Sequence, residues 1–372
     1  MELLQNDSTV EPTMALDHAA ECIKTGLATE LEEKTEELNW QSDLLQTMSH
    51  DYERYTCADD ALPMSPSYRN ETWYDDRNGV EHPVFVLLER PQSIVRVVDG
   101  FIDDEQCQAI EEAAAPSLGE ATVADGDGGS VVGSGRKALQ AGITVPWHLE
   151  ADGDPIAALS RKVYDYTDSV LGLGITEEGQ EGLMSIQYSG RTEDDPEPDH
   201  YDPHCDGDCE GSQHKWGGRV ATVVMYCTVP TSGGATNFRR AGLHVTPKKG
   251  RAVFFSYIDP RTMTMDDGFT LHSGCPVLEG KKKIVTQWIR HGVTEEVPWS
   301  RYDSSEYNTL RGHGDASGFI LVVLVVAASA LCLCSCPYTT VTKSLPPFFV
   351  SVCPTCTHTN TPTFLFLCPH NR

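Results

Sequence analysis

Three residues of this sequence have the types and the spacing of a metal site: His204, Asp206 and His272. Two histidines and one carboxylate form the facial ligand set of non-haem Fe(II) centres, which leaves positions on the metal open for chemistry. His204 and Asp206 are two residues apart, so on a strand both side chains point to the same face and can bind one ion. His272 lies far along the chain, and we expect it to reach the ion from a different strand.

A lysine follows at a distance that suits an anionic co-substrate. Lys282 lies ten residues after His272, in a stretch with the alternating pattern of a strand. One face of that strand would carry Lys282, Ile284, Thr286 and Trp288. Lys281 and Lys283 point the other way, and we expect these two to lie on a solvated edge strand. Lys282 is therefore the cation that we expect inside the site.

A His-x-Asp tripeptide is a weak signal by itself, because a chain with 13 histidines and 55 acidic residues contains such tripeptides by chance. The surrounding segments are more specific. After an opening segment VVDGFIDDEQCQAIEEAA, the chain contains in order HYDPHCD, GGRVATVVMYCTVPTSGGATNF, VTPKKGRAVFFSY and LHSGCPVLEGKKKIVTQWI. Together these segments closely resemble the catalytic domain of the prolyl 4-hydroxylases, which are 2-oxoglutarate and Fe(II) dioxygenases. The resemblance covers roughly residues 84–299, a little over half of the chain.

The resemblance implies a fold and a reaction. The fold would be mainly β with flanking helices (α+β), and its catalytic core would be a double-stranded β-helix, or jelly roll. Fe(II) would be bound by His204, Asp206 and His272, and 2-oxoglutarate would chelate it with the far carboxylate on Lys282. With O2 as the second co-substrate, peptidyl proline would become 4-hydroxyproline, with succinate and CO2 as co-products. Ascorbate would restore iron that is oxidised in uncoupled turnovers.

The same resemblance points to further residues of the pocket. In the family, a tyrosine upstream of His-x-Asp helps to bind the 2-oxoglutarate carboxylate, and Tyr188 is the matching position. We expect Thr236 to contribute to co-substrate binding from a neighbouring strand. Tyr201 and Trp288 are expected to form walls of the substrate pocket.

The chain departs from the family pattern in ways that leave the substrate open. Cys205 and Lys283 stand where aromatic residues are usual, and an acidic insertion occupies residues 191–199. We expect residues 119–135 and 191–217 to form lids over a peptide, with the insertion favouring Lys or Arg near the target proline. The alternatives are an oxygenase for another side chain or a small molecule, and a catalytically silent module that binds proline-rich chains.

Cysteine chemistry is also open at this stage. Cys205 and Cys209 are close enough in sequence for a local disulfide, but we favour Cys205 as a small buried hydrophobic residue. The 13 cysteines of the chain, several of them near its end, do not indicate a redox compartment by their number.

The charge of the chain argues against one class of partner. Its net charge of −27 does not suit a phosphate backbone, which requires clustered Lys and Arg, so we expect no nucleic-acid binding. Residues 1–77 contain 18 acidic and five basic residues. We favour a solvated acidic surface there over attraction of a basic peptide.

The sequence predicts a helical N-terminal extension before the catalytic domain. Residues 1–80 would form this extension, and an apolar stripe at helical spacing comprises Leu16, Ala20, Ile23, Leu27, Leu31, Leu38 and Leu45. We expect the stripe to pack on its own domain; the alternative is a partner or a second copy bound through residues 14–48. Residues 59–79, rich in Pro and Asp, are predicted to be a linker.

The catalytic domain is predicted to span residues 81–300, with its jelly-roll core at about 184–292. Short alternating runs broken by Gly, Pro and Asp support that core. The expected elements before it are strands at 84–88 and 94–98, helices at 103–115 and 154–171, and a mobile loop at 119–135.

The last part of the chain is predicted to be a linker at 301–317, a transmembrane helix at 318–335 and a tail without regular structure at 336–372. The apolar run 318–334 is uncharged and near the lower length limit for a spanning helix. A membrane anchor is the favoured interpretation, and an incorrectly predicted end of the gene is the alternative.

The compartment has two interpretations. Family members that act on collagen-like proteins work in the endoplasmic reticulum, and sequons at Asn6 and Asn70 would allow glycosylation there. We favour a membrane-associated protein of that compartment. Residues 1–20 lack the pattern of a cleavable secretion signal, which favours the cytosol as the alternative.

Overall fold

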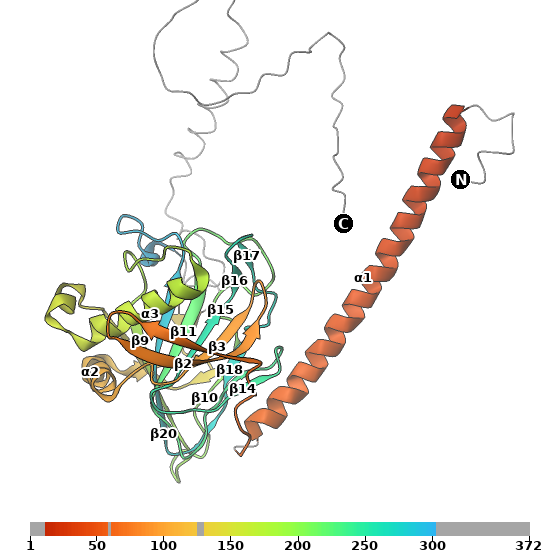
Figure 1. Ribbon diagram of the computed structural model, residues 1–372. Helices are drawn as coiled ribbons and strands as arrows, with labels where there is room; N and C mark the ends of the chain where they lie inside the picture. The colour runs from red at the N-terminus through yellow and green to blue at the C-terminus, as the bar shows by residue number, and fades with distance from the viewer. Residues whose placement is uncertain (1–11, 59–60, 125–129, 303–372) are drawn as a thin grey trace, which may run out of the picture. The chain divides into compact units, whose positions relative to one another are not determined.

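The computed structural model describes residues 12–58, 61–124 and 130–302 (Figure 1). The linker predicted at 301–317 lies almost entirely outside the described residues, as do the helix predicted at 318–335 and the tail at 336–372. Within the described ranges, no helix is both long enough and apolar enough to cross a bilayer.

The N-terminal helix, α1 (Pro12–Ala58), forms as the apolar periodicity predicts. Its stripe, however, does not pack on the domain: Ile23, Leu27 and Leu31 are 64%, 61% and 69% exposed. The prediction of self-packing is therefore wrong for these residues. A stripe at helical spacing identifies a face that is available for burial, but it does not identify what covers that face.

The last turns of α1 do contact the catalytic domain. The carboxylate of Glu53 accepts hydrogen bonds from the side chains of Asn237 and Ser273, and Cys57 forms a disulfide with Cys275. Asn237 and Ser273 are both buried. The end of α1 is therefore fixed to the strands that carry these residues.

The segment predicted to be a linker contains a strand instead. β1 (Arg69–Asp75) pairs antiparallel with β2 (Val80–Glu89) through a tight turn. Asp75 shapes the turn by accepting hydrogen bonds from the backbone N–H groups of Arg77 and Asn78, and Gly79 has the positive φ of 64° that closes it. Turn-forming residues between two strands resemble a linker in sequence, so residues 69–79 were assigned wrongly.

Two antiparallel sheets form the core of the domain, and the predicted jelly roll is confirmed. The larger sheet has the order β1-β2-β3-β15-β11-β20-β9-β8-β4. Its remaining strands are β3 (Ile94–Val98), β15 (Ala252–Ser256), β11 (Arg219–Thr228), β20 (Lys281–Arg290), β9 (Leu183–Ser189), β8 (Leu139–Ile143) and β4 (Gly119–Glu120).

The smaller sheet has the order β14-β13-β18-β10-β7. Its strands are β14 (Leu243–Val245), β13 (Thr236–Phe238), β18 (His272–Gly274), β10 (His200–His204) and β7 (Arg136–Lys137). Three two-stranded sheets complete the described strands: β5 (Val123–Ala124) with β6 (Ser130–Val131), β12 (Ser232–Gly233) with β19 (Val277–Glu279), and β16 (Ile258–Asp259) with β17 (Thr264–Met265). The stretch 119–135 is therefore partly strand, contrary to the predicted loop.

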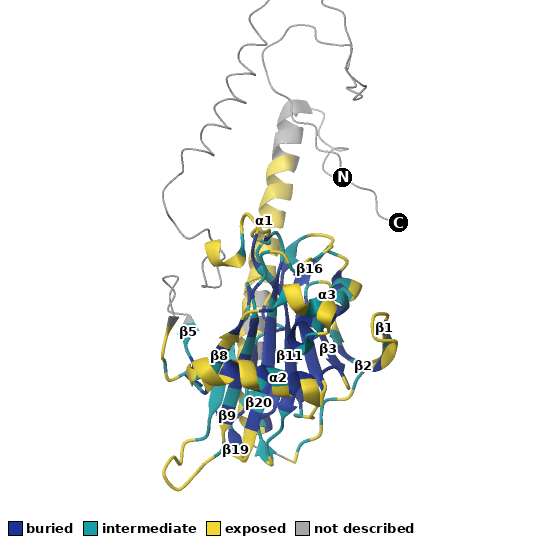
Figure 2. Cartoon of the chain, turned by 90° about the vertical axis from the view of Figure 1, so that its left-hand side faces the viewer, coloured by how far each residue is buried: buried dark blue, intermediate teal, exposed yellow. Residues whose placement is uncertain are grey.

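Two helices cover one face of the larger sheet, as Figure 2 shows for its buried strands β11 and β20. They are α2 (Asp104–Ala114) and α3 (Pro155–Leu171), within a residue or so of the predicted helices. Asp103 caps α2 in a capping box with Gln106, and Asp154 caps α3. The short 3-10 helices are η2 (Ala115–Ser117), η3 (Trp147–Asp152) and η4 (Trp299–Arg301).

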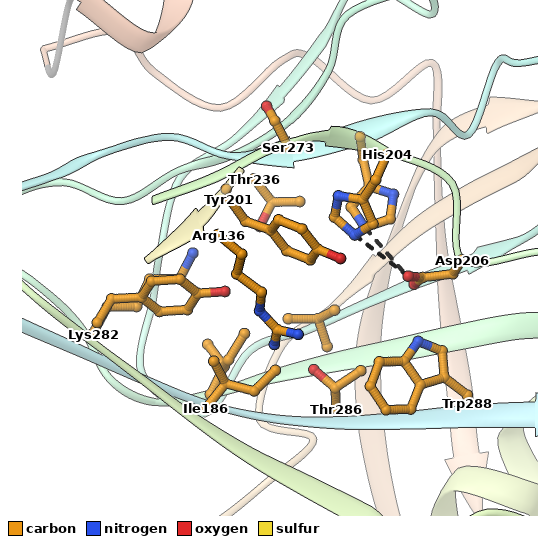
Figure 3. Close-up of a pocket in the computed structure, with 15 residues that line it drawn as sticks. Arg136, Ile186, Tyr201, His204, Asp206, Thr236, Ser273, Lys282, Thr286 and Trp288 are labelled. Carbon is orange, nitrogen blue, oxygen red and sulfur yellow. Dashed lines mark ion pairs between the residues drawn. The ribbon is translucent and has the colours of Figure 1, made fainter. Parts of the chain in front are cut away.

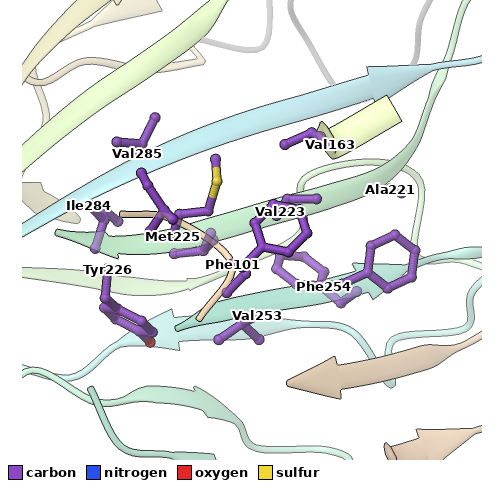
Figure 4. Packing of buried hydrophobic residues seen from close by; sticks show 14 of the residues in the cluster. Phe101, Val163, Ala221, Val223, Met225, Tyr226, Val253, Phe254, Ile284 and Val285 are labelled. Carbon is purple, nitrogen blue, oxygen red and sulfur yellow. The ribbon is translucent and has the colours of Figure 1, made fainter. Parts of the chain in front are cut away.

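The core between the helices and the larger sheet is fully buried. Its largest side chains include Phe101, Met225 and Phe254, all fully buried (Figure 4). Tyr166 is also among them and is 1% exposed. Tyr166 packs edge-on against Phe254 with a centroid separation of 5.3 Å. This packing holds β11, β15 and β20 rigidly, and two of these strands also line the candidate site.

The lysine-rich strand is not at an edge. β20 lies between β11 and β9, and the ammonium group of Lys283 lies 2.5 Å from the carboxylate of Glu111 on α2. Lys281 is exposed. The expectation of a solvated edge strand is therefore wrong, because the pattern KKK does not reveal that a helix supplies an acidic partner.

Candidate functional site

The structure brings the three predicted metal ligands together between the two sheets. His204 ends β10, His272 begins β18, and the two are direct cross-strand partners. Asp206 follows β10. One ligand atom from each residue lies within 4.8 Å of the others. The Nε2 atom of His204 is 3.4 Å from Asp206 Oδ1, and that of His272 is 3.7 Å from Asp206 Oδ2 (Figure 3).

The backbone orients both imidazole rings. The Nδ1 atom of His204 lies 2.9 Å from the carbonyl oxygen of Asp202, and that of His272 lies 3.1 Å from the carbonyl oxygen of Thr270. A carbonyl accepts only, so each Nδ1 carries the proton and each Nε2 keeps its lone pair for a metal. Two Nε2 donors and one carboxylate suit Fe(II).

Electrostatics keep the ligands in their metal-binding protonation states. Burial alone would raise the pKa of Asp206, but His272, His204 and Arg219 outweigh it and hold that pKa well below its usual range. Burial and the neighbouring His204 lower the pKa of His272 to about 4. At neutral pH the site therefore offers an anion and a neutral imidazole, as a divalent cation requires.

A hydroxyl group positions the carboxylate. Thr222 on β11 donates a hydrogen bond of 2.8 Å to Asp206 Oδ2, and its oxygen is 3.2 Å from the Tyr257 hydroxyl. Thr222 is fully buried. Groups that orient a ligand in this way usually affect metal affinity by about 10- to 100-fold.

We expect Thr222→Val to weaken Fe(II) binding by about 10-fold or more while the fold is retained, because valine has a similar shape but cannot donate to Asp206. Metal titration of the purified variant measures this change. Thr228→Val, at the half-buried end of the same strand, is the control. Equal metal affinity in wild type and Thr222→Val would show that the hydroxyl does not position the ligand.

A network of buried charged residues that the sequence did not predict contacts the backbone of Asp206. Arg219 donates to the backbone carbonyl of Asp206 at 3.3 Å and forms an ion pair of 2.6 Å with Glu181. Arg290 pairs with the same carboxylate at 2.6 Å. The residues are distant in sequence, so no motif or spacing indicates the network.

The predicted co-substrate lysine lies in the same pocket as the metal ligands. Lys282 is 2% exposed, and burial lowers its pKa to about 7. The structure gives it no ion-pair partner in the described part of the chain. Its ammonium nitrogen is 5.2 Å from the ring centre of Tyr188. An uncompensated cation in this position suits the carboxylate of a ligand.

The other predicted residues line this pocket as well. Tyr188 and Thr236 are both 4% exposed, and Thr236 is hydrogen-bonded at 2.6 Å to Tyr226. Tyr201 stacks on the His204 ring with centroids 3.5 Å apart, and Trp288 lies under the Arg219 guanidinium at 4.2 Å. The alternating residues of β20 all reach the pocket, as their period predicts.

Arg136 is a pocket residue that sequence reasoning missed. It pairs with Tyr201 across β7 and β10, and its guanidinium lies 4.6 Å from the Tyr201 ring centre. It is 7% exposed, and its Nε has no hydrogen-bond partner in the described residues. A single arginine in a glycine-rich stretch carries no spacing signal.

The residue between two of the ligands is part of a disulfide. Cys205 pairs with Cys209 in the structure, so the favoured interpretation of Cys205 as a small hydrophobic residue is wrong. The bridge closes a short loop that contains Asp206 and restricts the backbone of this ligand.

Comparison with known proteins agrees with the predicted resemblance. Residues 190–290 match the family model described as the 2OG-Fe(II) oxygenase superfamily. The match covers the metal ligands and Lys282, and the resemblance predicted from the sequence is confirmed for this part of the chain. Fe(II) and 2-oxoglutarate are the metal and co-substrate expected from that match.

Curated relatives carry a more specific name. Prolyl 4-hydroxylase subunit alpha-1 of Gallus gallus is 26% identical over 246 residues, which cover 63% of this chain and 44% of the relative. Subunit alpha-3 of Rattus norvegicus is 31% identical, covering 55% of this chain and 34% of the relative. The chain thus spans less than half the length of these relatives.

One solved structure among the matches is a viral collagen prolyl hydroxylase from Paramecium Bursaria Chlorella virus-1 in a complex with 2OG. It is 26% identical, with a TM-score of 0.41, and the match covers 53% of this chain and 95% of that one.

Proposed function

We propose that this chain is a 2-oxoglutarate- and Fe(II)-dependent dioxygenase that hydroxylates proline in a peptide, with ascorbate as a supporting reductant. The observation that carries the proposal is a single buried pocket with a two-histidine, one-carboxylate donor set at one end and an uncompensated lysine further along β20. The names of the curated relatives support proline as the target.

The proposal assigns a binding role to each group of residues in the pocket. His204, Asp206 and His272 hold the metal, while Lys282 binds the far carboxylate of 2-oxoglutarate. With Fe(II) bound, O2 would be the oxidant: conversion of 2-oxoglutarate to succinate and CO2 would use two of its four oxidising equivalents, and hydroxylation of an unactivated C–H bond the other two. The protein orients the reactants and excludes water.

Co-substrate and substrate would occupy different parts of the pocket. Tyr188 and Thr236 lie near Lys282 and would accompany it in co-substrate binding. Tyr201 and Trp288 flank the metal ligands and would hold the target proline, whose ring suits contact with aromatic surfaces. Arg136 would donate to a peptide carbonyl through its unpaired Nε.

Product analysis tests the proposal. The purified chain with Fe(II), 2-oxoglutarate and ascorbate should hydroxylate (Pro-Pro-Gly)-type or other proline-rich peptides, and mass spectrometry should locate 4-hydroxyproline. Succinate formation without hydroxyproline would indicate another side chain or a small molecule as substrate. Peptide binding without any turnover would indicate a catalytically silent module.

The compartment proposed for the chain is the endoplasmic reticulum, with membrane association through residues 318–335. Three disulfides among the described cysteines support an oxidising environment. The exposed stripe of α1 supports a helix-mediated partner or self-association through residues 14–48. Glycan occupancy at Asn70, which is exposed on β1, would be found in cells if the domain is lumenal.

A further inference from the structure

On the neighbouring strands β9 and β20, the rows of inward-facing side chains continue beyond the metal pocket. On β9 the row runs from Tyr188 through Ile186 to Met184, and on β20 it runs from Lys282 to Trp288. Thr286 pairs directly with Met184. Trp288 lines the metal pocket and also a second cavity, which Met184 lines too. The two cavities are therefore adjacent along a shared wall.

The second cavity has the size and the walls of a peptide-binding site. Its volume is about 750 Å³, and its walls come from residues 142–145 and 177–184 together with Trp147, Tyr164, Trp288, Glu295 and Trp299. Trp147 and Trp299 stand on segments that follow β8 and β20 in the chain. Flat aromatic surfaces of this kind suit proline-rich segments, which have a preformed extended shape.

The charge of this cavity is negative and partly uncompensated. Glu177 is paired with Arg161, and Glu181 is paired with Arg219 and Arg290. Glu178 and Glu295 are exposed, and neither has an ion-pair partner among residues 12–58, 61–124 and 130–302. Two exposed carboxylates on the wall of this cavity suit a Lys or Arg side chain through their charge. The rings of Trp147 and Trp288 already lie against Arg161 and Arg219.

In the acidic insertion, by contrast, two of the carboxylates form ion pairs within the protein. Lys137 donates to Asp195 at 2.7 Å and lies 3.8 Å from Asp199. These contacts tie the insertion to β7 and neutralise two of its carboxylates. The expected attraction of basic substrates is thus better served by the second cavity than by residues 191–199.

The junction between the cavities has a free donor. Nε1 of Trp288 is buried and has no hydrogen-bond partner within the described residues. In Figure 3 the nitrogen edge of this ring lies on the side of Asp206. A peptide that passes from the metal pocket to the second cavity would place a backbone carbonyl within reach of this donor, which satisfies a buried polar group.

We propose that the second cavity, defined by Trp147, Glu178, Trp288, Glu295 and Trp299, binds the part of the substrate peptide that flanks the target proline. Trp147 and Trp299 hold flanking prolines, Trp288 forms the boundary with the metal pocket, and Glu178 and Glu295 select a Lys or Arg. The inference rests on the proposed function for the identity of the peptide, but the binding itself does not require turnover.

Peptide binding tests the proposal without relying on activity. Fluorescent proline-rich peptides with Lys at successive flanking positions, and the same peptides with Gln, are titrated with the full chain, and anisotropy gives the Kd. At low salt we expect the best Lys peptide to bind about 5- to 10-fold more tightly than its Gln counterpart, since each exposed pair contributes modestly. The difference should shrink in 0.5 M salt through screening.

Matched variants locate the effect. The double variant Glu178→Gln, Glu295→Gln should abolish the Lys preference and leave the Gln peptide unchanged, while Trp299→Ala should weaken both peptides. The control pair is Glu193→Gln with Asp194→Asn, two exposed acids of the insertion, and it should retain the preference. A preference that survives the cavity variant, or is lost only in the control, overturns the proposal.

Turnover separates this inference from the proposed function. If the chain hydroxylates proline, the cavity variant should raise the KM of the Lys peptide with kcat unchanged, because the lost contacts lie away from the metal. Lys-selective binding without hydroxylation of any peptide would refute the proposed function and leave the cavity assignment standing. Hydroxylation of proline without any preference for Lys peptides would support the proposed function and refute the cavity assignment.

Discussion

Replacing Asp206 with alanine is expected to remove Fe(II) binding and turnover together. The carboxylate is the one charged member of the donor set, and it lies within 4 Å of the Nε2 atoms of both His204 and His272. Without it, two neutral imidazoles would have to hold a divalent cation in a buried pocket, which is unfavourable. Metal titration and succinate formation measure the two losses, and His204→Ala and His272→Ala should behave in the same way.

A neighbouring histidine supplies the control. His200 lies on the same strand as His204, but its Nδ1 contacts the carbonyl oxygen of Pro198, 3.1 Å away, and it is not part of the metal group. His200→Ala should therefore retain metal binding and most of the activity. Succinate formation by Asp206→Ala at the wild-type rate would refute the assignment of the three ligands.

Lys282→Met should raise the KM for 2-oxoglutarate by about 100-fold or more, because a buried carboxylate would lose its cation. Without co-substrate, the same variant should have a higher Tm than wild type, since methionine removes a desolvated charge that has no partner there. Lys283→Met is the control: it loses the pair with Glu111 and should leave the KM unchanged. If Lys283→Met is instead the damaging change, the strand register assigned to the site is wrong.

The same lysine predicts a pH dependence. Its pKa of about 7 in the free protein lies below the ordinary lysine value of 10.5, so above pH 7 the free side chain is largely neutral and must take up a proton to pair with a carboxylate. The affinity for 2-oxoglutarate should fall as pH rises above 7, and this part of the pH dependence should be absent in Lys282→Met.

The stability of the co-substrate-free protein should change with pH in the opposite direction to its affinity for 2-oxoglutarate. Between pH 7 and 10.5 the unfolded chain binds more protons at Lys282 than the folded chain, so this group makes stability rise with pH in that window. Below pH 7 the full cost of burying the charge is present. The Tm advantage of Lys282→Met should therefore be largest near pH 7 and below, and smaller at pH 9.

Local patterns allowed the residues that meet in the pocket to be predicted. The two-residue spacing of His204 and Asp206 and the alternation along β20 depend only on strand geometry, so Lys282 could be chosen from three lysines before the fold was known. The capped helices α2 and α3 carry their start signals within one turn. The match of ordered motifs to a family then implied how distant strands combine.

What the sequence did not predict depends on contacts between distant residues. Arg136, Glu181 and Arg219 meet the site only through the packing of sheets, and no spacing relates them. Glu111 changes the environment of Lys283 from another element. The partners in the two long-range disulfides, Cys57–Cys275 and Cys107–Cys227, were equally hidden, because many pairings of 13 cysteines are compatible with one sequence.

The cross-link between Cys57 and Cys275 has a consequence for the covalent topology of the chain. It closes a ring with a sequence separation of 218, and the bridges Cys107–Cys227 and Cys205–Cys209 lie one inside the other within it. A protease that cuts once inside the outer ring leaves one molecule of unchanged mobility in non-reducing gels, which reduction separates into two fragments. A chain cut once between Cys57 and Cys275 therefore keeps α1 covalently bound three residues beyond His272, so such a cut does not release the helix from the metal site.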